Sequence, residues 1–63
     1  MTLEEMRARL DAIETERRAI HDAAGEAALS EEQQTRWDEL DTEEKELREQ
    51  VTAAERRERA TAA

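Results

Sequence analysis

Carboxylates are the only reactive side chains that this sequence supplies in number. It contains 18 Asp and Glu residues, one His and no Cys. Two carboxylates can share acid and base roles when an apolar cleft raises the pKa of one of them. The sequence has no apolar stretch to form such a cleft, so we interpret the carboxylates as charges on solvated helix faces.

His21 is the single candidate for imidazole chemistry. No Glu precedes it at the Glu-x-x-His spacing that builds di-metal sites in helical bundles. The lack of Cys removes thiolate ligands and thiol nucleophiles, and no Gly-rich phosphate loop is present. The sequence therefore predicts that the chain is not an enzyme and has no catalytic residue, no cofactor and no metal site.

Trp37, the one aromatic residue, lies in the segment that organises the chain, residues 29–54. Ser30 and Gln33 have the spacing of a capping box, which begins a helix. Apolar residues then recur at steps of three and four and form one stripe: Trp37, Leu40, Leu47, Val51 and Ala54. At this spacing Trp37 is predicted to be a core residue rather than a platform for a ligand. The pattern predicts a helix near 31–60.

The N-terminal part repeats this design. Thr2 and Glu5 have capping-box spacing, and Gly25 stands where a helix would end. The stripe between them holds Leu3, Met6, Leu10, Ile13 and Ile20, with Arg17 in line. The pattern predicts a helix near 3–24 and a hinge near 25–30.

Two amphipathic helices joined by a short hinge favour one arrangement. We predict an all-α fold, a single domain at 1–63, in which the helices form an antiparallel coiled-coil hairpin. The predicted register places Leu10 opposite Leu47 and Ile20 opposite Trp37. The predicted helix–helix seam comprises Leu3, Met6, Leu10, Ile13, Arg17, Ile20, Leu29, Trp37, Leu40, Glu44, Leu47, Val51 and Ala54.

Arg17 and Glu44 are the two charged residues of this seam. The register places them in adjacent layers, where they could pair across the hairpin. Two interpretations remain open. The pair fixes register and partner choice at some cost in stability, or each side chain extends its charge to solvent.

Net charge and hydropathy limit the partners. The net charge of −8 argues against binding to nucleic acid. No apolar run approaches the ~18 residues of a membrane span, and no signal-peptide segment is recognised, so we expect a cytosolic protein. Because a hairpin covers its stripe on one side only, we expect homo-oligomers, built as a helical bundle through Met6, Leu10, Leu47 and Val51.

The order of these features resembles a known family. The residues that carry the resemblance are the Leu29-Ser30-Glu31-Glu32 start, the Arg36–Leu40 step, Glu46-Leu47 and the Glu55-Arg56-Arg57 tail. They are similar to the N-terminal scaffolding segment, or delta domain, of tailed-phage major capsid proteins of the Hong Kong 97 type. Trp37 replaces the usual Phe of that family.

The resemblance implies a scaffold inside the immature phage shell, in the cytoplasm of the bacterial host. Its partners would be further copies of itself and the capsid subunits. A phage maturation protease would remove it afterwards. The alternative is a coiled-coil adaptor or a regulatory module, such as a hairpin that acts on RNA polymerase through an acidic tip formed by Glu26, Glu31 and Glu32.

Overall fold

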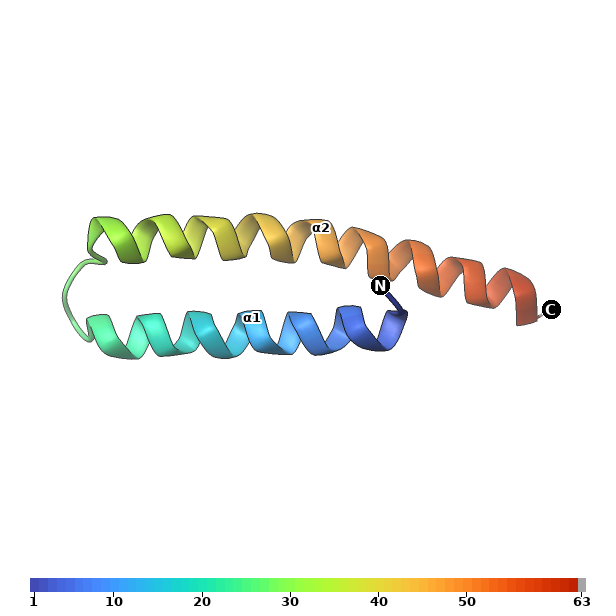
Figure 1. Ribbon diagram of the computed structural model, residues 1–63, viewed down its shortest axis with the longest axis horizontal. Helices are drawn as coiled ribbons and strands as arrows, with labels where there is room; N and C mark the ends of the chain where they lie inside the picture. Colours follow the sequence, from blue (N-terminus) through green and yellow to red (C-terminus); the bar gives the residue numbers. More distant parts are fainter. Residues whose placement is uncertain (63) are drawn as a thin grey trace.

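The computed structural model describes residues 1–62 as two helices, α1 (Leu3–Ala24) and α2 (Glu31–Ala62). The helices run antiparallel and lie side by side along the length of α1 (Figure 1). The molecule is a narrow rod with extents of 51 × 17 × 15 Å. The predicted all-α helical hairpin is confirmed. The predicted domain, 1–63, ends at Ala63, which lies outside the described residues.

α1 begins where its capping box predicts. The backbone N–H of Glu5 donates to the Thr2 hydroxyl over 3.1 Å, and the N–H of Thr2 donates to the Glu5 carboxylate over 3.3 Å. These two bonds satisfy backbone donors that the first turn leaves without an intrahelical partner. The bond from the Thr2 N–H also lowers the pKa of Glu5, because the ionised carboxylate is the better acceptor.

The hinge begins at Gly25, which ends α1. Its φ of 60° is a conformation that favours glycine, and its N–H donates to the His21 carbonyl over 3.1 Å. Any other residue at this position would be strained through its backbone, although a Cβ would meet no neighbouring atom.

α2 begins after Ser30 with the second predicted capping box. The N–H of Gln33 donates to the Ser30 hydroxyl over 3.2 Å, and the N–H of Ser30 donates to the Gln33 amide oxygen over 2.9 Å. The helix continues to Ala62, two residues past the expected end near 60. Because no Gly or Pro follows Arg59 and Ala is the best helix former, nothing in the sequence stops the helix earlier.

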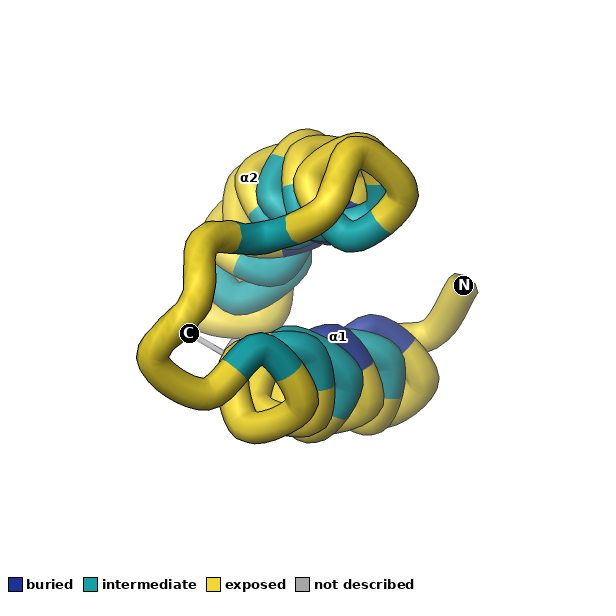
Figure 2. Tube along the Cα trace, turned by 90° about the vertical axis from the view of Figure 1, so that its left-hand side faces the viewer, coloured by how far each residue is buried: buried dark blue, intermediate teal, exposed yellow. Residues whose placement is uncertain are grey.

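α2 is longer than α1, with 32 residues against 22. Its C-terminal part therefore extends past the start of α1, as the right-hand side of Figure 1 shows. We call residues 55–62 the overhang. The buried and half-buried residues lie on the facing sides of the helices, and exposed residues cover the outside (Figure 2). Within the overhang, Glu55 is half-buried and residues 56–61 are exposed.

Candidate functional site

The helix–helix seam is the candidate functional site, and its centre is apolar. Four side chains form the core: Met6 and Leu47 are 5% exposed, and Ile13 and Leu40 are fully buried. The partly buried hydrophobic residues packed against this core are Leu3, Leu10, Ile20, Val51 and Ala54. Burial of this kind is the main favourable contribution to folding, at about 1.5–3 kcal/mol for each large apolar side chain.

The charged members of the seam, Arg17 and Glu44, meet across the two helices. Arg17 Nη2 donates a hydrogen bond to the Glu44 carboxylate, and Arg17 Nη1 lies 3.9 Å from Asp41. The Arg17 and Glu44 side chains are only 20% and 17% exposed. The hydrogen bond from Arg17 lowers the pKa of Glu44, and Arg48 adds to the effect from 3.5 Å. The pairing predicted from the register is therefore present.

Trp37 is not the core residue that its spacing predicted. It is half-buried and is absent from the hydrophobic residues packed against the core. The Arg17 guanidinium lies 5.7 Å from the centre of its ring, within the range of a cation–π contact. The physical reason for the difference is that Arg17 occupies the neighbouring layer and covers the indole face with a charged group. Leu29, which was also predicted for the seam, is half-buried where the hinge joins α2.

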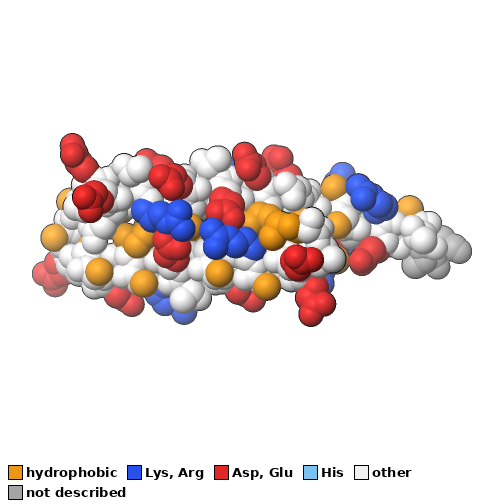
Figure 3. Space-filling model, viewed as in Figure 1, with side chains coloured by type: hydrophobic (Ala, Val, Ile, Leu, Met, Phe, Trp, Pro, Cys, Tyr) orange, Lys and Arg blue, Asp and Glu red, His pale blue; other side chains and the backbone are white. Residues whose placement is uncertain are grey.

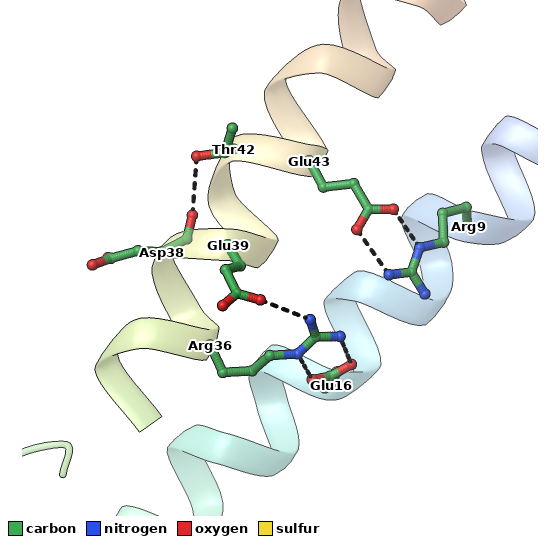
Figure 4. A network of polar contacts seen from close by, with 7 residues as sticks. All are labelled: Arg9, Glu16, Arg36, Asp38, Glu39, Thr42 and Glu43. Carbon is green, nitrogen blue, oxygen red and sulfur yellow. Dashed lines mark hydrogen bonds and ion pairs between the residues drawn. The ribbon is translucent and has the colours of Figure 1, made fainter. Parts of the chain in front are cut away.

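A row of ion pairs follows one edge of the seam. The Arg9 guanidinium donates two hydrogen bonds to the Glu43 carboxylate, over 2.5 and 2.8 Å. The Arg36 guanidinium likewise makes two hydrogen bonds to Glu16, one of them over 2.8 Å. Figure 4 shows each guanidinium facing a carboxylate of the opposite helix. We call Arg9, Glu16, Arg36 and Glu43 the charged rim.

The charged rim shifts the pKa of its members in the direction that favours the ion pairs. The hydrogen bonds from Arg9 lower the pKa of Glu43, and those from Arg36 lower the pKa of Glu16. In return, the pKa of each of the two guanidinium groups is raised. Both carboxylates therefore stay ionised to a lower pH than an ordinary Glu.

The order and the polarity of the two ion pairs in the charged rim favour one register of the antiparallel helices. Moving seven residues forward in α1, from Arg9 to Glu16, moves the partner seven residues back in α2, from Glu43 to Arg36. The polarity also reverses, because Arg lies on α1 in the first pair and on α2 in the second. A shift of one heptad would place Glu16 beside Glu43, so like charges penalise that slipped register.

The opposite edge of the seam is held more loosely. Arg7 lies 3.6 Å from Glu55, and both side chains are more than one-third exposed. Glu55 also lies 3.8 Å from Arg59, one turn further along α2. On the one face of the molecule that Figure 3 shows, charged side chains of both signs lie along the line where the helices meet, with hydrophobic side chains between them.

The four residues of the charged rim are not among the site residues predicted from the sequence. The signal was present in the heptad lettering, because all four precede an a position directly and so occupy g positions. In an antiparallel coiled coil, the g positions of the two helices flank the same edge of the seam. Composition alone could not distinguish them from the other charged residues.

The homo-oligomer contact expected through Met6, Leu10, Leu47 and Val51 stays a prediction, because the structure describes a single chain. Met6 and Leu47 are buried inside the hairpin, and Leu10 and Val51 are half-buried against them. These side chains cover one another, so they leave little apolar area for a further copy. In the described part of the chain, an open apolar groove lies at the open end of the hairpin, lined by Met1, Leu3, Ala53 and Ala54 among others.

The residues considered for chemistry lie on the surface. His21 is exposed, 3.7 Å from Asp22. Within residues 1–62, no cluster of three or more His, Cys, Asp or Glu side chains is placed to hold a metal ion. Neither described helix is long and apolar enough to cross a membrane.

Comparison with protein-family models, curated proteins and solved structures found no match for this chain.

Proposed function

We propose that this chain is the scaffolding segment of a tailed-phage capsid protein of the Hong Kong 97 type. It would act without enzymatic chemistry, by bringing capsid subunits together in the immature shell. The observation that carries the proposal is that three residues of the family resemblance have structural roles in the hairpin. Ser30 caps α2, and Leu40 and Leu47 belong to the four-residue core.

The size of the core supports an assembly role. Four buried side chains in a two-helix rod are a small core for a folded domain. Contacts with further copies would make such a hairpin more stable, because a partner that binds the folded state and not the unfolded state stabilises the folded state. Tethering to shell subunits raises the effective concentration of the copies and favours these contacts.

The charge of the chain supports removal after assembly. Each copy carries a net charge of −8, so many copies inside a shell would repel incoming DNA. Cleavage by a phage maturation protease would clear the interior before packaging. In this proposal, the segment works inside the immature shell, in the cytoplasm of the bacterial host.

The experiment that tests the proposal places seam and tip variants in the parent capsid chain. Leu40→Asp should give aberrant or absent shells, because it puts an unpaired carboxylate into the core. The matched control replaces Glu26, Glu31 and Glu32 by Gln. All three are exposed at the hinge end, so this variant should assemble normally.

Electron microscopy of the particles, made side by side, separates the outcomes. Normal immature shells from the Leu40→Asp chain would contradict the scaffold proposal. The alternative is that the acidic tip contacts a regulatory partner such as RNA polymerase. It would be favoured if the tip variant folds normally but no longer affects that partner.

A further inference from the structure

An open groove lies where the overhang leaves the hairpin. α1 contributes its first residues, Leu3 and Met6, together with Met1 before it. α2 contributes one helical face that includes Ala54, Arg57, Glu58 and Thr61. Met1 is 73% exposed and is the one large hydrophobic side chain in the described residues that is strongly exposed.

The α2 face of this groove is suited to another helix. Ala53 and Ala54 have short side chains, which let a second backbone approach closely. Arg57 and Glu58 are adjacent, and no ion pair within residues 1–62 involves either of them. A helix that docks here would therefore have to present apolar side chains to the groove, together with one acidic group for Arg57 and one basic group for Glu58.

The overhang differs in charge from the rest of the chain. Residues 55–62 contain three Arg and two Glu, a net charge of +1, whereas residues 1–54 contain seven basic and sixteen acidic residues, a net charge of −9. Two hairpins packed side by side along their length would repel each other. Two copies that meet only through their overhangs keep the acidic parts apart.

The direction of the contact follows from Arg57 and Glu58. In a parallel pair of overhangs, each Arg57 would face the other Arg57, and each Glu58 the other Glu58. In an antiparallel pair that crosses between these residues, Arg57 of each copy lies beside Glu58 of the other. The same crossing brings Ala54 opposite Thr61 and places the partner helix over Met1 and Leu3.

We propose that a second copy of this chain docks in the groove through its own overhang, as an antiparallel two-fold dimer with two reciprocal Arg57–Glu58 ion pairs. This inference rests on the self-association in the proposed function and names its surface. A two-fold contact uses the same patch on both copies and closes on itself. It would therefore join the scaffolds of two subunits in pairs.

Sedimentation equilibrium of the 63-residue chain tests this contact through charge exchange. Arg57→Glu and Glu58→Arg should each weaken dimerisation by about tenfold, because two ion pairs become two like-charge contacts. An equimolar mixture of the two variants should recover the native affinity, because each contact in the mixed dimer joins Glu with Arg. Circular dichroism should show the same helix content in all samples.

Two features keep net charge from explaining the result. Arg56→Glu changes the charge as much as Arg57→Glu but lies outside the groove, and it should leave the dimer unchanged. Glu58→Arg makes the net charge of −8 less negative, so a general effect of repulsion would strengthen association instead of weakening it.

Any of three results would overturn the inference. The native chain could stay monomeric at several hundred micromolar, or the mixture could associate no better than the separate variants. The third is that Arg56→Glu weakens dimerisation as much as Arg57→Glu does. None of these decides the scaffold proposal, which is judged by the shells that the Leu40→Asp parent chain assembles.

Discussion

The interior of the seam and the charged rim hold the two helices together in different ways. Ile13 and Leu40 are fully buried, and apolar contacts have little directional preference. Arg9 and Glu43 lie partly in solvent but make two hydrogen bonds with a defined geometry. Burial in the interior provides most of the stability, whereas the rim selects one alignment among several that would bury similar area.

Arg17 and Glu44 lie between these two regions. They occupy the stripe of the interior but use the chemistry of the rim. A half-buried ion pair pays a desolvation cost that its attraction only partly repays, so its clearest use is to set register. The contact of Arg17 with Trp37 adds to this use, because it ties the same guanidinium to the hinge end of α2.

The largest effect should come from breaking the interior. Leu40→Asp places a carboxylate at a fully buried site and should cost several kcal/mol, enough to unfold the hairpin at low concentration. Thr35→Asp is the matched control, because it adds the same charge at an exposed site of α2. Circular dichroism should show helix loss in the first variant only; retained cooperative melting in Leu40→Asp would contradict the assigned core.

A smaller effect is expected at the Arg17–Glu44 pair. Arg17→Met leaves Glu44 half-buried without its main partner and should lower the free energy of unfolding by about 1–2 kcal/mol. The double variant Arg17→Met, Glu44→Leu should recover at least that loss, because two apolar residues need no partner. Urea titration of monomeric samples measures both. A double variant that is less stable than the native chain would show that the pair itself stabilises the hairpin.

The charged rim should respond to charge reversal by a few degrees. Arg9→Glu or Glu43→Arg creates a like-charge contact at a partly exposed site and should lower the melting temperature by roughly 2–5 °C. Combining both changes should restore most of the lost melting temperature, since the ion pair is then rebuilt with the charges exchanged. Without such recovery in the double variant, Arg9 and Glu43 would not be energetically coupled in solution.

The smallest effect is a pH dependence of the rim. The pKa values of Glu16 and Glu43 are lowered in the folded chain, so their stabilisation is fully present above the ordinary Glu pKa of about 4.5. It is lost as the pH falls from there through the lower folded values. The variant Glu16→Gln, Glu43→Gln should therefore melt below the native chain at pH 7 and together with it near pH 2.

The comparison with the double Gln variant is needed because acid also removes the repulsion among the other carboxylates, which stabilises the hairpin. A constant difference between the two proteins from pH 7 to pH 2 would exclude the rim carboxylates as its source. Added salt should reduce the same difference at pH 7, since exposed ion pairs are screened.

The sequence alone determined both helices, both N-terminal caps and the position of the hinge. These features depend on local interactions: Ser30 and Gln33 are three residues apart, and Gly25 is the only residue suited to its backbone conformation. The 13 residues predicted for the seam are all buried or half-buried in the structure. Helical periodicity places them on one face, whatever the details of packing.

The tertiary structure decided which charges meet and which apolar surface stays open. Arg9 and Arg36 have long side chains with several carboxylates in reach, so only the relative position of the helices selects Glu43 and Glu16. The same holds for Trp37, because its exposure depends on where Arg17 lies across the seam. The groove at the open end is lined by residues of both helices, so its shape depends on how the start of α1 packs against α2.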